Sequence, residues 1–332
     1  MLASPLRRVV AGVSGVVIVA IVWFALQYFP VGGSGREALI TVRSGDSMST
    51  IAGELHQAGI MSSPFAFRID SFLEGAPLVH PGDYEIPQGA SFSSIRSILN
   101  GGPNVPQVDV VPGLTIKEIA VSVASQVGNT FASTFLSDAN QAATLSPYHP
   151  TGSLDGLIGP GLYLITPSET PAQLLAAMRA NFATEATAAG LTPSTSVLGL
   201  NAYHLLIAAS IVEKEGYYAK NMPRTARVIY NRLAHNMPLQ MDSTVLYALG
   251  MDGGKVTPAM LQTQTPYNTY LNLGLTPTPI CVVSPTALSA VLHPPAGTWL
   301  YFVLVDKSGD MAFSTTYAGQ LANEAKAAKA GV

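Results

Sequence analysis

Charge is scarce in this sequence of 332 residues, because Asp, Glu, Lys and Arg together make up only 11% of it. Soluble domains usually carry about 25% of these residues. The formal net charge is −3, so there is no basic excess of the kind that attracts nucleic acid. We therefore expect no nucleic-acid partner.

Cysteine is almost absent as well, and Cys281 is the only one. A single cysteine excludes an internal disulfide and a Cys-rich metal cluster. We expect its thiol to be a small packed side chain rather than a nucleophile. Neither a metal nor a cofactor is expected.

One long run without charge lies near the N-terminus, at 9–29, directly after Arg7 and Arg8. It is long enough to cross a bilayer, which takes about 20 residues as a helix. A cleaved signal peptide is the alternative, but no clear small-x-small cleavage site follows the run. We predict an uncleaved transmembrane helix in the inner membrane, with residues 1–8 in the cytoplasm. Everything after the linker at 30–37 would then lie on the extracytoplasmic side.

A small module is predicted over 38–102. Its expected elements are a strand over 38–42, a helix starting at Met48, a helix over 65–73 and a strand over 82–86. This order, with Arg43, Ser44 and Gly45 near its start, resembles a LysM-like module, which implies glycan binding. The alternative is a packing module that only spaces the rest of the chain from the membrane.

The remaining chain, 108–332, follows a proline-bounded boundary at 103–106. Helices are expected after the capping-box residues Thr115 and Glu118 and over 172–189. A buried strand is expected over 300–305. We predict an α+β fold class, with an N-terminal transmembrane helix, the small LysM-like module and an α+β catalytic domain.

The best candidate for an acid lies at the end of an apolar helix. Asn201 suits the N-cap and Gly216 the C-cap of this helix, whose apolar part at 205–212 is too short to span a bilayer. Glu215 falls at the edge of the apolar face, where partial burial and the helix dipole both favour its protonated form. Such an acid suits a glycosidic leaving group. The alternative is a solvated helix end.

Several later motifs follow this helix in a characteristic order. The first motif is Ile-Val-Glu-Lys-Glu at 211–215, which ends with Glu215. It is followed by Tyr-Asn-Arg-Leu at 230–233 and by Met-Pro-Leu-Gln-x-Asp-x-Thr-Val at 237–245. Further matching segments are 265–270, 274–280, 293–294 and 300–303. The order resembles the endolytic murein transglycosylases, the YceG-like family, over nearly the whole chain. The chain departs from the family pattern at Leu157, Gly159, Thr278, Met311 and Gln320. The family tends to carry histidines where Met311 and Gln320 stand, so those histidines can have no role in the mechanism here.

The resemblance implies a lytic transglycosylase that cleaves β-1,4 bonds between MurNAc and GlcNAc within nascent peptidoglycan strands. The products would carry 1,6-anhydro-MurNAc ends, and the cut would terminate glycan elongation. Peptidoglycan strands and the membrane are the implied partners, with cell-wall synthases as candidates. Because the muramyl 6-hydroxyl replaces water, one carboxyl group can act first as acid and then as base. The family's catalytic glutamate matches Glu215.

Other polar residues of the motifs each have two interpretations. Asp242 either orients substrate or is the N-cap of the next helix. Asn231 and Gln240 can hydrogen-bond acetamido groups or Glu215, but neither can be an acid or base. Arg232 either holds a stem-peptide carboxylate or packs on the helix. Glu213 is expected to stabilise a helix end or to pair with an arginine at 224 or 227.

The segment around Tyr267, Asn268 and Thr269 is polar and aromatic, as substrate-binding loops often are. These side chains can hydrogen-bond sugar hydroxyls or N-acetyl groups, or they only hold the turn. Two other functions stay open. One is a membrane-tethered peptidoglycan-binding protein without catalysis. The other is a muramidase that uses Glu215 and Asp242 with water.

Overall fold

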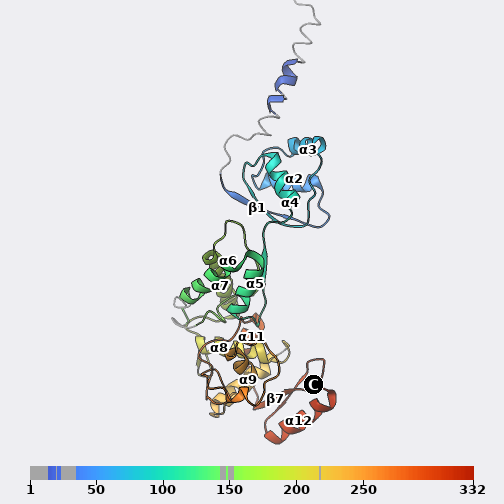
Figure 1. The fold of residues 1–332 in the computed structure, drawn as a ribbon. Coiled ribbons are helices and arrows are strands. Elements are labelled where there is room, and N and C mark those ends of the chain that lie inside the picture. The colour runs from blue at the N-terminus through green and yellow to red at the C-terminus, as the bar shows by residue number, and fades with distance from the viewer. Residues whose placement is uncertain (1–13, 20, 24–34, 143–146, 149–152, 217) are drawn as a thin grey trace, which may run out of the picture. The chain divides into compact units, whose positions relative to one another are not determined.

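The computed structural model describes residues 14–19, 21–23, 35–142, 147–148, 153–216 and 218–332 (Figure 1). The chain divides into two compact units. The first unit runs to residue 107 and includes 164–169, and the second comprises 108–163 and 170–332. Helices and two-stranded sheets occur in both, which confirms the α+β class.

The predicted transmembrane helix lies largely outside the described residues. Across the ranges that the structure covers, no helix is both long and apolar enough to cross a bilayer. Of the predicted span at 9–29, only 14–19 and 21–23 are described, and residues 1–8 are not. The span therefore stays a prediction.

The first unit has the predicted order of strand, helix, helix and strand. Its elements are β1 (Glu37–Val42), α2 (Met48–Gln57), α3 (Pro64–Leu73), β2 (Gly82–Pro87) and α4 (Phe92–Gly101). β1 and β2 are antiparallel, with Ile40 opposite Tyr84. Both side chains join a buried cluster with Phe67 and Phe92, whose rings meet edge to face. This unit thus has a hydrophobic core of its own.

The second unit is mostly helical. Its helices are α5 (Ile116–Val127), α6 (Asn129–Ala142), α7 (Pro171–Ala189), α8 (Ala202–Glu215), α9 (Met222–Ala234), α10 (Asp242–Ala248), the 3₁₀ turn η2 (Met260–Gln262), α11 (Pro285–Leu292) and α12 (Tyr317–Ala330). Three short strand pairs complete it: β3 (Gln107–Val110) with β4 (Gly161–Leu164), β5 (Ser196–Val197) with β6 (Leu200–Asn201), and β7 (Tyr301–Leu304) with β8 (Met311–Ser314).

Helix α8 is the core of the second unit. It packs against α9, α10 and α11, and its residues from Ala202 to Val212 are buried apart from His204. A helix that is apolar all round must be covered on all sides. The more polar end of α8, from Glu213 to Glu215, is only partly buried. The apolar run therefore fixes the helix in the core and brings its last turn to the edge of the core.

The ends of α8 lie where the sequence predicts them, but Gly216 is there for another reason than expected. Asn201 accepts a hydrogen bond from the backbone of His204, as an N-cap does. Gly216 has a right-handed backbone, so no left-handed turn requires glycine. A Cβ at this position would instead lie 2.6 Å from Met222 Cγ and 2.7 Å from the Val212 carbonyl oxygen. Glycine lets α9 begin directly against the end of α8.

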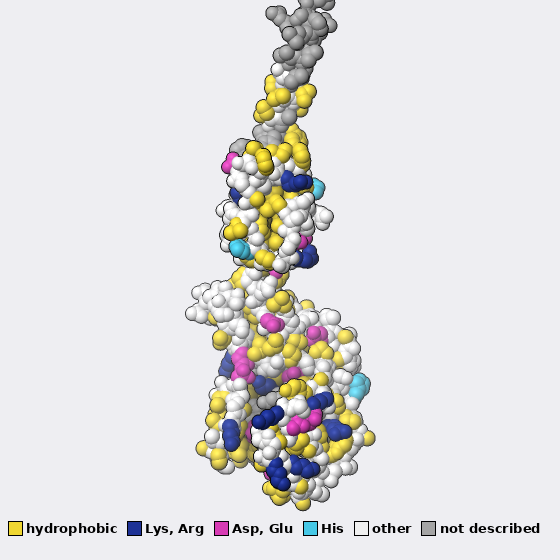
Figure 2. Space-filling view, turned by 90° about the vertical axis from the view of Figure 1, so that its right-hand side faces the viewer, with side chains coloured by type: hydrophobic (Ala, Val, Ile, Leu, Met, Phe, Trp, Pro, Cys, Tyr) yellow, Lys and Arg dark blue, Asp and Glu magenta, His cyan; other side chains and the backbone are white. Residues whose placement is uncertain are grey.

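The strand predicted as buried over 300–305 is only partly so. β7 spans Tyr301–Leu304, and all of its residues are intermediate in exposure. It pairs with a single strand, β8, and lies against α12 and α9, and such a two-stranded ribbon does not bury every side chain. On the face drawn in Figure 2, acidic and basic side chains are interspersed among uncharged ones, in keeping with the low charge of the sequence.

Candidate active site

Glu215 is the last residue of α8, and its carboxyl group is bound by the start of α10. Glu215 Oε1 accepts a hydrogen bond from Ser243 Oγ at 2.7 Å and one from the Ser243 backbone N–H at 3.2 Å. The side chain is intermediate in exposure. The carboxyl group is therefore held in one orientation at the edge of the core.

Burial raises the pKa of Glu215 above its ordinary value. The hydrogen bonds from Ser243 oppose this rise because they stabilise the carboxylate, whereas the negative charge of Asp242 adds to it. The positive charge of Arg232 has a smaller opposing effect. Partial burial, one of the causes expected from the sequence, thus favours a carboxylic acid that keeps its proton closer to neutral pH. Such a group can protonate a leaving oxygen.

The N-cap role considered for Asp242 is wrong, because Met241 occupies the N-cap position of α10. Asp242 is the first residue inside the helix, where a carboxylate still interacts favourably with the helix dipole. Its Oδ1 accepts a hydrogen bond from the Tyr270 hydroxyl at 2.6 Å. Asp242 therefore links α10 to the loop that carries Tyr270, beside the residue that binds Glu215.

Glu213 stabilises a helix end, as predicted. Its Oε2 accepts a hydrogen bond at 2.8 Å from the backbone N–H of Ser284, the N-cap of α11. It does not form the ion pair considered for it, since Arg227 donates to the carbonyl oxygens of Pro294 and Pro295. Arg224 stacks over Trp299. Glu213 thus joins α8 to α11 and is a structural residue.

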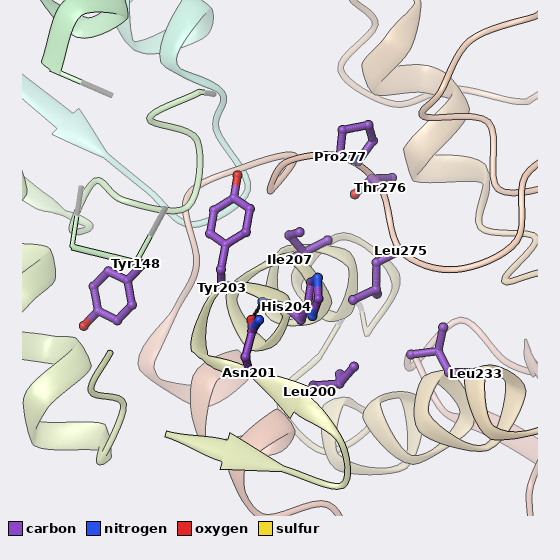
Figure 3. Close-up of a pocket in the computed structure, with 10 residues that line it drawn as sticks. All are labelled: Tyr148, Leu200, Asn201, Tyr203, His204, Ile207, Leu233, Leu275, Thr276 and Pro277. Carbon is purple, nitrogen blue, oxygen red and sulfur yellow. Dashed lines mark hydrogen bonds between the residues drawn. The ribbon is translucent and has the colours of Figure 1, made fainter. Parts of the chain in front are cut away.

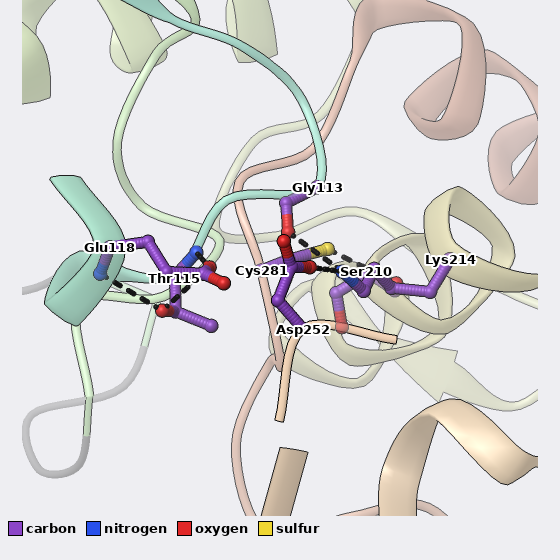
Figure 4. A network of polar contacts seen from close by, with 7 residues as sticks. All are labelled: Gly113, Thr115, Glu118, Ser210, Lys214, Asp252 and Cys281. Atoms are coloured by element: carbon purple, nitrogen blue, oxygen red, sulfur yellow. Dashed lines mark hydrogen bonds and ion pairs between the residues drawn. The ribbon is translucent and has the colours of Figure 1, made fainter. Parts of the chain in front are cut away.

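Lys214 connects three segments around the same helix end (Figure 4). Its Nζ donates to the carbonyl oxygen of Gly113 at 3.2 Å and to Asp252 Oδ1 at 2.9 Å. Gly113 precedes α5, and Asp252 follows α10. The contacts fix the last turn of α8, and with it Glu215, relative to both neighbours.

Cys281 lies in the same network and is fully buried, as predicted. Its Sγ contacts the carbonyl oxygen of Ser210 at 3.3 Å. Burial raises the pKa of the thiol well above its ordinary value. A neutral buried thiol is a poor nucleophile, so Cys281 is a packing residue.

Asn231 and Arg232 bind the chain's own backbone. Asn231 Nδ2 donates to the carbonyl oxygens of Gly297 and Trp299 at 3.1 and 2.8 Å. Arg232 is only 6% exposed, donates to the carbonyl oxygens of Leu300 and Leu239, and lies over the ring of Tyr301. These contacts favour the packing interpretation of Arg232. The contacts of Asn231 stabilise the segment that leads into β7. Substrate binding by Asn231 stays a prediction.

Gln240 has a strained backbone and an exposed side chain. Its φ is 52°, in the left-handed region that non-glycine residues seldom adopt. Its backbone N–H donates to the carbonyl oxygen of Thr269 at 3.0 Å, which stabilises the turn before α10. Strain of this kind is often found next to functional sites. The side chain of Gln240 is exposed, and its binding of substrate stays a prediction.

Asn268 and Thr269 hold the turn rather than face solvent. They are 0% and 2% exposed, respectively. Asn268 donates to the carbonyl oxygens of Leu261 and Thr263. Thr269 Oγ1 accepts from the Met241 N–H at 3.0 Å. Burial of both residues contradicts direct sugar contact in this structure and supports the alternative interpretation.

Tyr267 is more accessible than its neighbours in the loop. Its hydroxyl lies 2.8 Å from Thr278 Oγ1, and its ring is 5.1 Å from the ring of Tyr247. It lines a cavity of about 370 Å³ beside α10. Of the three loop residues predicted to bind substrate, Tyr267 is thus the one that a ligand can reach.

Asp155 is a buried carboxylate that the sequence did not indicate as part of the site. It is 3% exposed and accepts hydrogen bonds from the Ile116 N–H, the Ser153 hydroxyl and the Tyr247 hydroxyl. Burial raises its pKa, and these donors oppose the rise. Its position in an Asp-Gly pair signals only a turn. Through its bonds to Tyr247 and to the Ile116 N–H, Asp155 joins α10 to the start of α5.

A larger cavity, of about 560 Å³, lies at the other end of α8 (Figure 3). Asn201, His204 and Ile207 line it from that helix, opposite Leu233 of α9 and Pro277. The helix rises about 1.5 Å per residue, which separates this cavity from Glu215 by nearly the helix length. It is not part of the Glu215 site. No His, Cys, Asp and Glu cluster suited to a metal ion occurs among the residues that the structure describes.

The chain is similar to known proteins over most of its length. The chain is 29% identical over 299 residues to the endolytic murein transglycosylase of Bacillus subtilis (strain 168), covering 83% of this chain and 81% of that protein. It is 27% identical to the endolytic murein transglycosylase of Streptococcus pneumoniae (strain D39), but spans only 58% of that protein's length.

A crystal structure of a YceG-like protein from Listeria monocytogenes has a similar fold, with a TM-score of 0.54 at 24% identity. The match covers 87% of this chain and 99% of that one. The model of the YceG-like family matches residues 40–326, which cover most of both units and include Glu215. The chain therefore belongs to the YceG-like family.

Proposed function

We propose that this chain is an endolytic murein transglycosylase, a lyase that cleaves β-1,4 bonds between MurNAc and GlcNAc within nascent peptidoglycan strands. The relatives in Bacillus and Streptococcus carry this name. The observation that carries the proposal is the carboxyl group of Glu215, which is partly buried, bound by Ser243 and has a raised pKa.

Glu215 acts twice in the proposed reaction. It first donates its proton to the glycosidic oxygen as the bond from that oxygen to the muramyl C1 breaks. Its carboxylate then accepts the proton of the muramyl 6-hydroxyl while that oxygen bonds to C1. The 1,6-anhydro ring forms without water, and Glu215 ends protonated as it began. The donors of Ser243 stabilise the carboxylate between the two steps.

The surroundings of the other carboxylates favour this assignment over a hydrolase with two carboxylates. Asp242 is bonded to Tyr270, and Asp155 is buried and accepts several hydrogen bonds. Glu213 is bound to the start of α11. Glu215 is thus the carboxyl group best suited to exchange a proton with substrate.

Replacing Glu215 tests this proposal directly. Glu215→Gln keeps the shape and removes the acid, so strand cleavage should fall by about 10²- to 10⁴-fold. Glu213→Gln is the matched control, because its amide oxygen can still accept from Ser284. The control should retain most of its activity. Near-normal cleavage by Glu215→Gln would refute the role of this residue.

We also propose that the run at 9–29 anchors the chain in the inner membrane as a single span. The flanking Arg7 and Arg8 would keep the N-terminus in the cytoplasm. A reporter fused after Val332 should then be active only outside the cytoplasm, and the protein should stay with membranes in high salt. Release of a shortened soluble form would instead indicate a cleaved signal peptide.

The first unit is proposed to bind glycan as a LysM-like module. Its strand-helix-helix-strand order and its own core support the proposal. The isolated segment 38–102 should then be retained by insoluble peptidoglycan. A lack of retention would leave it a spacer between membrane and enzyme.

Cell-wall synthases are proposed partners, because a nascent strand is cut where it is made. Cross-linking of the full chain in growing cells should capture a glycan-polymerising enzyme. If that enzyme is not enriched over an unrelated membrane protein, the proposed partnership is wrong.

A further inference from the structure

The cavity beside α10 is lined by both aromatic and charged side chains. Its volume is about 370 Å³, and the side chains that line it include Lys117, Glu118, Asp155, Tyr247, Met251 and Tyr267. All of them belong to the second unit. The lining thus combines aromatic rings with charged groups.

This cavity lies next to the Glu215 site. Tyr247 follows Ser243 by one turn of α10, so both side chains project from the same side of that helix. The loop at 267–270 contacts α10 at two places, because the Tyr270 hydroxyl donates to Asp242 and the ring of Tyr267 lies against that of Tyr247. A strand lying along α10 from Glu215 would therefore enter the cavity.

Tyr247 and Tyr267 both line the cavity, and their rings lie 5.1 Å apart. The hydroxyl of Tyr247 donates to the buried Asp155 at 2.7 Å, and that of Tyr267 pairs with Thr278 at 2.8 Å. Both hydroxyls are therefore occupied within the protein and fix the rings in place. Fixed aromatic faces suit the apolar face of a pyranose ring.

Lys117 is the basic residue of the lining, beside the acids Glu118 and Asp155. It is exposed and forms no ion pair within the parts of the chain that the structure describes. The two acids of the lining are hydrogen-bonded within the protein: Glu118 accepts from Thr115 in the capping box (Figure 4), and Asp155 accepts from three donors. Burial raises the pKa of Asp155, and the charge of Lys117 partly opposes that rise. The remaining ammonium group at the rim is suited to a ligand carboxylate.

We propose that this cavity is a subsite for a peptide-bearing muramyl residue, with its sugar on Tyr247 and Tyr267 and a stem-peptide carboxylate facing Lys117. The inference rests on the proposed function, because it names the strand that the Glu215 site prefers. Peptide-bearing strands offer both groups, whereas strands stripped of peptide keep the sugar and carry a carboxylate only on the lactyl group attached to it. The enzyme should therefore prefer the peptide-bearing strands.

Kinetics of the full chain on both kinds of strand test the subsite. Lys117→Gln should raise KM for peptide-bearing strands about two- to fivefold, as expected for loss of an exposed ion pair, with kcat unchanged. Its KM for stripped strands should not change. Lys117→Arg should keep the preference, and high salt should weaken it in the unmodified chain. Lys329→Gln, an exposed position on α12, is the control.

The contact between the sugar and Tyr267 is tested by a different effect on KM. Tyr267→Leu should raise KM on both kinds of strand, because the sugar is common to them, whereas Tyr267→Phe keeps the ring and should retain KM. No effect of Lys117→Gln, or equal effects on both strands, would overturn the peptide contact. The affinity for peptide-bearing and for stripped strands can also be compared without turnover. Both would be measured on the Glu215→Gln variant, with and without Lys117→Gln. If the unmodified chain cuts neither strand, the proposed function fails, and this binding comparison still decides the subsite.

Discussion

Replacing Thr269 by valine should destabilise the second unit. Thr269 Oγ1 accepts from the buried Met241 N–H at 3.0 Å and lies 2.9 Å from Thr244 Oγ1. Valine keeps the shape but offers no acceptor, so the Met241 N–H is left unpaired. Thr244 still donates to the Met241 carbonyl oxygen at 2.7 Å. One unpaired buried donor lowers the free energy of unfolding by about 1–3 kcal/mol.

Thermal unfolding of the full chain in mild detergent measures this loss. For a domain of this size, each kcal/mol lowers Tm by roughly 2–4 °C, so Thr269→Val should unfold about 2–12 °C earlier. Thr269→Ser keeps the acceptor and should lose only about 1 kcal/mol for its missing methyl group. Because Met241 leads into α10, any loss of activity should appear in kcat. Unchanged Tm with a raised KM would refute the structural role and return Thr269 to direct sugar binding.

Three further predictions concern the protonation of Glu215. Ser243→Ala removes a donor that stabilises the carboxylate, so the pKa of Glu215 should rise further and the loss of activity at high pH should move to higher pH. Asp242→Asn removes a neighbouring negative charge, so the same limb of the pH–rate profile should move to lower pH, with substantial activity kept below it; an inactive but folded variant would contradict the single-acid mechanism. Glu215→Gln should become more stable relative to the unmodified chain as pH rises. Because folding raises the pKa of Glu215 above its ordinary value of 4.5, the unmodified chain loses stability as pH rises from 4.5 through the folded pKa, and the glutamine variant does not. Denaturant titrations at several pH values measure that difference, and a pH-independent difference would contradict it.

Local patterns predicted the position of Glu215 well. The cap at Asn201 and the apolar run of α8 are short-range signals, and they place Glu215 at a helix end partly buried by the core. The reason for Gly216 was not predictable in the same way. It depends on Met222, which approaches only when α9 folds against α8.

Contacts between distant segments were beyond the reach of sequence patterns. Asp155 and Tyr247 are 92 residues apart, and neither belongs to a motif that indicates the other. The polar side chains of Asn268 and Thr269 show that hydrogen bonds are needed. They do not show whether a sugar or the buried backbone provides the partners. Burial decided that question, and it required the packed structure.

The chemical form of the new strand ends tests the central claim most directly. Purified glycan strands would be digested with the full chain and examined by mass spectrometry before and after borohydride treatment. If Glu215 acts alone as acid and base, the new muramyl ends carry a 1,6-anhydro ring and resist reduction. Ends heavier by one water and reducible by borohydride would show that water is the nucleophile, which would contradict the transglycosylase mechanism.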